Sequence, residues 1–193
     1  MNKKAQGFTI VELLIVIVVI AILAAISIAA YTNIQQRAKN TAIINAASQS
    51  LKMIEAYIAA NGTYPAKGSQ VYSCITADSG CHSGGPTPFG ASLTFSSAMA
   101  TIGVLPKSVP SEGTSLYGVA YIYEQGDSFN PESQPARLTY FLLGVDQQCG
   151  LPGVMMATAT SGERVSSTTG YSNSNMTSDK TVCHINIPGQ AHS

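Results

Sequence analysis

Glu12 is the side chain whose position most strongly suggests a chemical role. It is the only charged residue between Lys4 and Arg37, and a predominantly apolar run follows it to Ala30. A carboxylate in a membrane-spanning segment costs about 2.5–3.5 kcal/mol at mid-bilayer and less near the interface, so such a residue indicates function. A buried carboxylate is stabilised by a cation within about 4–6 Å. Glu12 is therefore a candidate for pairing with a positive group.

The other reactive side chains form no recognisable catalytic or metal-binding pattern. The sequence contains no serine elbow, no phosphate-cradling glycine loop and no metal-binding helix motif. Acidic residues in predicted turns do not have the spacing of a calcium loop. We predict that the chain is not an enzyme and binds neither a cofactor nor a metal. The side chains that could otherwise act as catalytic groups or metal ligands are His82, His184, His192, Asp127, Asp146 and Asp179.

Composition excludes some classes of function. The 193 residues include ten basic and ten acidic side chains. Nucleic-acid binding calls for clustered Lys and Arg, which this balance does not favour. Hydrophobic residues make up 45% of the chain, which argues against disorder. The length suits one modest globular domain plus an N-terminal rod.

Three interpretations compete for the N-terminus. No residue from Leu13 to Gln36 is charged, and about 20 apolar residues suffice to span a bilayer as a helix. A secretory signal has a basic start, as Lys3 and Lys4 provide, but its apolar core is about 7–15 residues long. A plain membrane anchor explains the length. Neither explains Glu12.

The third interpretation accounts for Glu12. Residues 3–15 read KKAQGFTIVELLI and resemble the leader and first turns of type IV prepilins. The resemblance implies cleavage between Gly7 and Phe8 by a prepilin peptidase on the cytoplasmic side. It also implies N-methylation of the new Phe8 amine, and it makes Glu12 the fifth residue of the mature chain, where the family carries its glutamate. Our hypothesis is that the Phe8 amine of a neighbouring subunit satisfies Glu12 during assembly.

The resemblance also implies a function and partners. The chain would be a structural subunit of a type IV pilus-like filament, a homo-oligomer assembled through its apolar helix. An inner-membrane platform and a cytoplasmic ATPase would lift the precursor from the lipid of the cytoplasmic membrane into a filament at the cell surface. Within the family, a type II secretion pseudopilin or a minor pilin is the alternative. From another class, the alternative is a membrane-anchored extracellular binding domain that does not polymerise.

Periodicity predicts one long helix from Phe8 to about Ala60, stopped at Asn61-Gly62. Its first half is apolar all round and its second half is amphipathic. Many pilins carry a proline near the position of Ala29, and its absence here predicts a straighter rod. The expected domains are a leader at 1–7, a helix at 8–61 with its transmembrane and assembly part at 8–30, and a head at 62–193.

The head is predicted to contain an antiparallel sheet. The fold class is therefore α+β, a pilin fold in which the long helix packs on a four-stranded antiparallel sheet. The head divides into an αβ-loop at 62–115, with a short helix at 95–102, and the sheet at 116–187. Loops are expected at 66–88 and 161–178. The predicted strands are 116–124, 137–145, 154–160 and 181–187.

Four cysteines in an exported chain favour two disulfides, with three possible connectivities. We expect Cys74–Cys81, which would close a small loop, and Cys149–Cys183, which would tie a late loop to the sheet as the C-terminal disulfide loop does in many pilins. Zinc is the alternative, because His82 and His184 each follow a cysteine. The spacing does not resemble zinc knuckles.

Overall fold

The computed structural model separates into two compact units, Met1–Ala38 and Lys39–Ser193. Helix α1 (Ile10–Asn61) begins in the first unit and ends in the second. The residues that the structure describes are 9–68, 70–76, 81, 90, 92–106, 117–124, 135–157, 164–166 and 180–187.

Helix α1 is continuous over 52 residues, as the absence of Pro and Gly from this stretch predicts. It ends at the predicted stop: Gly62 adopts φ of 66°, and its N–H donates to the Ile58 carbonyl at 2.8 Å. The Ser27 hydroxyl bonds back to the Leu23 carbonyl at 2.7 Å, so it remains within the helix pattern. The predicted first helical residue, Phe8, lies outside the described residues.

In the first unit, the side chains of α1 from Ile10 to Ile28 are exposed around the whole helix. Most of them are Ile, Val, Leu or Ala. Among the described residues, α1 is the one helix long and apolar enough to cross a membrane. A continuous exposed apolar surface of this kind is typical of a membrane-spanning or helix-packing segment.

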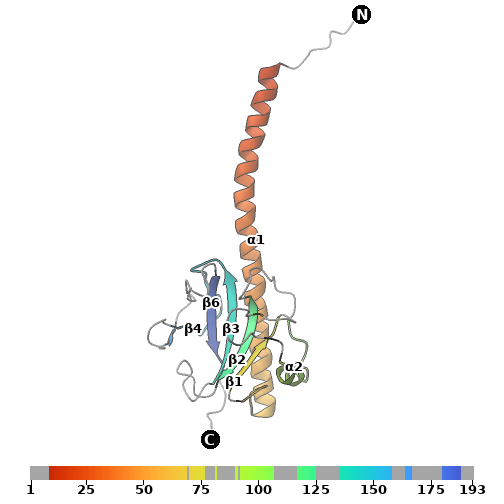
Figure 1. Cartoon of the computed structure of the whole chain (residues 1–193), viewed down its shortest axis with the longest axis vertical. Helices are drawn as coiled ribbons and strands as arrows, with labels where there is room; N and C mark the ends of the chain where they lie inside the picture. Colours follow the sequence, from red (N-terminus) through yellow and green to blue (C-terminus); the bar gives the residue numbers. More distant parts are fainter. Residues whose placement is uncertain are drawn as a thin grey trace, which may run out of the picture. The chain divides into compact units, whose positions relative to one another are not determined.

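The second unit contains a sheet in which every observed pairing is antiparallel. Its strand order is β1-β2-β3-β6-β4-β5, so the last strand of the chain lies between β3 and β4. Figure 1 shows β1, β2, β3 and β6 side by side. The strands are β1 (Gln70–Cys74), β2 (Gly118–Glu124), β3 (Ala136–Leu143), β4 (Val154–Ala157), β5 (Arg164–Ser166) and β6 (Lys180–Asn186).

The four predicted strands are confirmed as β2, β3, β4 and β6, and two short strands extend the sheet to six. β1 and β5 lie in the segments 66–88 and 161–178, which were predicted to be loops. β1 pairs with β2 along its full length, from Gln70 opposite Glu124 to Cys74 opposite Ala120. Pairing with a distant neighbour, rather than local composition, makes such a short segment a strand.

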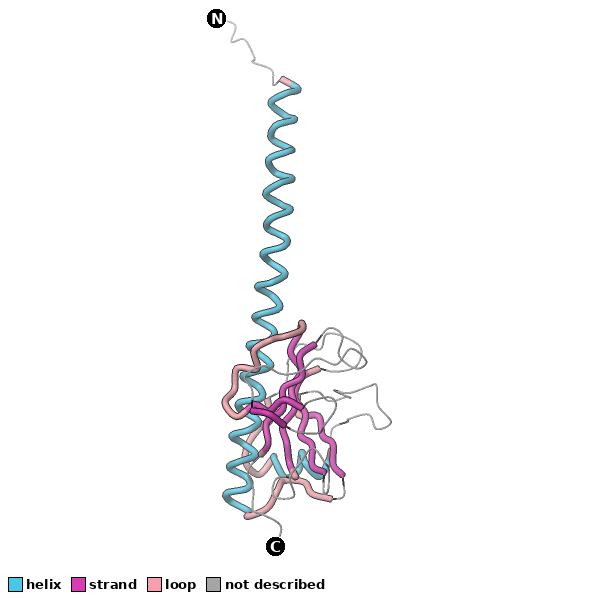
Figure 2. The backbone as a smooth tube through the Cα atoms, turned by 90° about the vertical axis from the view of Figure 1, so that its left-hand side faces the viewer, coloured by secondary structure: helices cyan, strands magenta, loops and turns pink. Residues whose placement is uncertain are grey.

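The core of the second unit is formed by side chains of α1 and of one face of the sheet. Figure 2 shows this part of α1 running beside the strands. The helix contributes Ile43, Ala47 and Ile54, and the strands contribute alternate residues, as the two-residue period of a strand requires. The predicted α+β packing of helix on sheet is confirmed. The alternate residues of β2 and β3 in this core are Val119, Tyr121, Tyr123, Leu138, Tyr140 and Leu142.

A short helix, α2 (Leu93–Met99), contributes Phe95 and Met99 to this core. The Ser92 hydroxyl caps it by accepting from the Phe95 N–H at 3.3 Å. Phe95 stacks on Tyr121 with ring centroids 4.7 Å apart. The helix was predicted at 95–102. In the structure it spans Leu93–Met99, so it begins two residues earlier, directly after the Ser92 cap, and ends three residues earlier.

Candidate functional site

The candidate assembly site is at the start of α1. The predicted cleavage residue Gly7 and the predicted methylated residue Phe8 lie outside the described residues. Thr9 is the first described residue, and Glu12 lies in the first helical turn. Thr9 and Glu12 are therefore the residues whose geometry bears on this site.

Thr9 and Glu12 form a reciprocal cap at the helix start. The Thr9 carbonyl accepts the first helical bond, from the Leu13 N–H at 3.3 Å. The Thr9 hydroxyl accepts from the Glu12 N–H at 3.3 Å and donates to the Glu12 carboxylate at 2.6 Å. The Thr9 N–H donates to the same carboxylate oxygen at 2.8 Å. This is a capping box, in which each residue satisfies a backbone N–H of the other.

The capping box gives Glu12 a partner within its own chain. The hypothesis from the sequence paired Glu12 only with an amine from another chain. The signal for the cap is nevertheless present, because Thr9 and Glu12 have the Thr-x-x-Glu spacing that precedes an apolar helix. Both bonds from Thr9 reach Oε2. Among the described residues, no hydrogen-bond donor reaches Oε1.

The electrostatics of the helix start favour an acid there. Exposed N–H groups give the N-terminus of a helix a partial positive charge, which a carboxylate in the first turn offsets. Glu12 is the acidic residue of that turn, and the next charged residue is Arg37. The charge is thus confined to one end of a long apolar surface.

Residues 2–28 match the family model described as the prokaryotic N-terminal methylation motif. This segment is a type IV prepilin cleavage motif. The prepilin motif ends at residue 28, so the match concerns the N-terminal segment and not the head. No curated protein and no solved structure matches the chain. The motif supports a pilin-like or pseudopilin precursor that is held in a membrane by its apolar helix.

The second unit contains two disulfides. Cys74 bonds to Cys81 and Cys149 bonds to Cys183, which is the pairing expected from the sequence. No cysteine is free. Zinc binding by these residues would need thiolates, and all four cysteines are oxidised in the structure.

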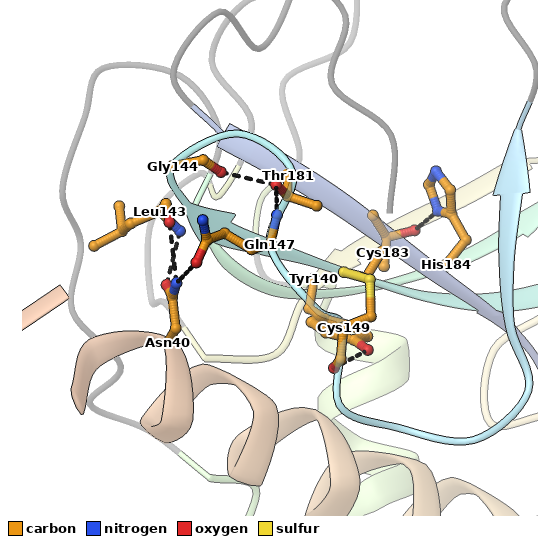
Figure 3. The surroundings of a disulfide bond; sticks show 10 residues. Asn40, Tyr140, Leu143, Gly144, Gln147, Cys149, Thr181, Cys183 and His184 are labelled. Atoms are coloured by element: carbon orange, nitrogen blue, oxygen red, sulfur yellow. Dashed lines mark hydrogen bonds between the residues drawn. A yellow bond between two sulfur atoms is a disulfide. The ribbon is translucent and has the colours of Figure 1, made fainter. Parts of the chain in front are cut away.

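The two disulfides lie on opposite faces of the sheet. Cys149 and Cys183 belong to the core beneath α1. The Tyr140 hydroxyl donates to the Cys149 carbonyl at 2.8 Å beside that bond (Figure 3). Cys74 and Cys81 pack with Ala120 and Ile122 in a second cluster. Each bond therefore holds a loop against one face of the sheet.

The histidines and turn acids named above form no site among the described residues. His184 is buried on β6, and its Nδ1 lies 2.7 Å from the Thr139 hydroxyl. Asp146 is exposed in a turn, with φ of 54°. Among the described residues, no group of three His, Cys, Asp or Glu side chains is placed to hold a metal. His82, His192, Asp127 and Asp179 lie outside the described residues.

Proposed function

We infer that this chain is a non-enzymatic structural subunit of a type IV pilus-like filament, assembled through its apolar N-terminal helix. The prepilin motif at residues 2–28, continuous with a long apolar helix that starts at a capped glutamate, is the observation that carries this conclusion. Cleavage ahead of the helix leaves the apolar rod on the mature protein. The product therefore remains in the cytoplasmic membrane until it is assembled.

The proposed processing divides the chain into three parts. Residues 1–7 are the leader, removed by prepilin peptidase after Gly7. Residues 8–61 are the helix, whose part at 8–30 spans the membrane and later lines the filament interior. Residues 62–193 are the head, which faces the exterior. Removal of Lys3 and Lys4 leaves eight basic and ten acidic side chains, a net charge of −2.

During assembly, the apolar helix leaves lipid and packs against the same helix of other subunits. In a membrane this exchange depends on close packing and polar pairing, because lipid is as apolar as the helix itself. Glu12 provides the polar pairing. The capping box holds Oε2, and Oε1 is left to accept from the methylated Phe8 amine of a neighbouring subunit. An inner-membrane platform and an ATPase would supply the work of extraction.

Two measurements test the proposal. Mass spectrometry of the membrane-derived protein should find a chain that begins at N-methylated Phe8. Electron microscopy should find surface filaments that disappear with Glu12→Val. An unprocessed N-terminus would favour the alternative of a membrane-anchored extracellular binding domain. A processed chain without surface filaments would favour a type II secretion pseudopilin or a minor pilin.

A further inference from the structure

Asn40 is a buried polar residue on the packed part of α1. The described side chains ahead of it on the helix are exposed or half-exposed, and Asn40 is the first buried one, at 6% exposure. The residues that follow it into the core, Ile43 and Ala47, are apolar. A buried amide without partners would be costly, so its hydrogen bonds decide whether this position is stable.

The Asn40 amide bonds both backbone groups of Leu143, the last residue of β3. Its Oδ1 accepts from the Leu143 N–H at 2.8 Å, and its Nδ2 donates to the Leu143 carbonyl at 3.0 Å (Figure 3). The pairing of β2 with β3 ends at Phe141. The amide therefore satisfies strand-end groups beyond the reach of β2, and the two bonds together define which end of the amide carries oxygen.

The turn after β3 extends this contact. Gln147 Oε1 lies 3.4 Å from Asn40 Nδ2. The Gln147 N–H donates to the Thr181 hydroxyl at 2.9 Å, and that hydroxyl donates to the Gly144 carbonyl at 2.8 Å. Thr181 is fully buried on β6. One hydroxyl on β6 thus holds both ends of the turn whose Gln147 reaches the helix.

We propose that Asn40 is a positioning residue that fastens the start of the packed half of α1 to the sheet, through a latch formed by Asn40, Leu143, Gly144, Gln147 and Thr181. The latch joins three elements that are far apart in sequence: α1, the end of β3 and the start of β6. Asn40 is the first buried residue among the described residues of the helix, and the core residues Ile43 and Ala47 follow it. This role does not depend on the proposed function.

Hydrogen exchange on the full chain in detergent micelles tests the latch. Asn40→Asp keeps the size and the acceptor of the side chain but places a carboxylate against the Leu143 carbonyl. We expect roughly tenfold faster exchange of α1 amides at 39–47, and little change at 52–58, because the core around Ile54 is not touched. Asn45→Asp is the matched control, since it makes the same change at an exposed position of the same helix.

Thr181→Val tests the far end of the latch with an isosteric change on another element. Its hydroxyl bonds the turn, so faster exchange at 39–47 is expected only if the turn transmits the loss to α1 through Gln147 and Leu143. Unchanged exchange at 39–47 in both variants would overturn the proposal. Equal acceleration in Asn45→Asp would also overturn it, because the effect would then be one of added charge.

Discussion

The Glu12 carboxylate accepts two hydrogen bonds from Thr9, from its hydroxyl at 2.6 Å and from its N–H at 2.8 Å. The acid that marks the prepilin motif is therefore also the third residue of the helix that Thr9 caps, and it completes that cap. Capping and charge pairing are two separable roles for one side chain. The two roles need different properties of the side chain, because a cap needs an oxygen acceptor and an ion pair needs a negative charge.

Glu12→Gln is predicted to separate these two roles. Glutamine can complete a capping box, so amide exchange in the first turns of α1 should stay close to wild type in micelles. The neutral side chain cannot form an ion pair with an amine, so the filament yield should fall strongly. A normal filament yield from the Glu12→Gln variant would show that the charge is not used in assembly.

Thr9→Val is predicted to destabilise the first turn of α1, which Glu12→Gln should leave intact. It removes the hydroxyl that caps the helix, which costs about 0.5–2 kcal/mol at an N-cap. Hydrogen exchange should accelerate at Leu13 and in the first turn. Ser27→Ala serves as the control, because the Ser27 hydroxyl bonds only back into its own helix. Equal exchange in the two variants would contradict the capping box.

Gly150→Ala is predicted to destabilise the head. Gly150 has φ of 74°, and an added Cβ would lie 3.0 Å from Ile44 Cδ1 on α1. The left-handed backbone alone costs about 1–2 kcal/mol for a residue with a Cβ. Gly153→Ala isolates that cost, since it has φ of 75° with open space around the Cβ. In chemical denaturation, Gly150→Ala should lose more stability than Gly153→Ala, and Ile44→Val should recover part of the difference.

The two disulfides are predicted to differ in their contribution to stability. Cys149 and Cys183 are 34 residues apart, whereas Cys74 and Cys81 are 7 apart. On a chain-entropy argument the longer loop contributes about 4 kcal/mol and the shorter about 2.5 kcal/mol. Paired Cys→Ala variants, compared by denaturant unfolding, should lose stability in that order. The reverse order would indicate that native packing outweighs loop entropy.

High pH is predicted to destabilise the head through its buried tyrosines. Burial raises the pKa of Tyr140 far above the ordinary tyrosine value, and burial followed by the nearby Tyr123 raises the pKa of Tyr121. The folded state thus favours the neutral phenol. The stability that each contributes is fully present below about pH 10 and is lost as pH rises beyond it.

Tyr140→Phe checks this dependence. The variant loses the hydrogen bond to the Cys149 carbonyl, so it should be less stable than wild type by about 0.5–1.5 kcal/mol at neutral pH. Above about pH 10 its stability should decline less steeply, because one ionisable phenol is gone. Parallel stability curves for the two proteins would contradict the role of Tyr140 in the alkaline loss.

The N-terminal site was largely predictable from the sequence. The basic start, Gly7, Phe8 and Glu12 identify the prepilin motif, and the capping box is readable from the spacing of Thr9 and Glu12. The continuity of α1 and its end at Asn61 also follow from the sequence, because a helical period and a Gly stop act between residues a few positions apart. The helix was predicted to include Thr9, but Thr9 caps it and the helix begins at Ile10.

Only the tertiary structure decided how the head is assembled. It placed β6 between β3 and β4, added β1 and β5 to the sheet, and brought Asn40 to Leu143 across 103 residues of chain. An asparagine in a helical sequence does not predict which distant groups it will hydrogen-bond. Such contacts depend on which backbone groups remain unpaired after the sheet has formed, and local sequence carries no record of that.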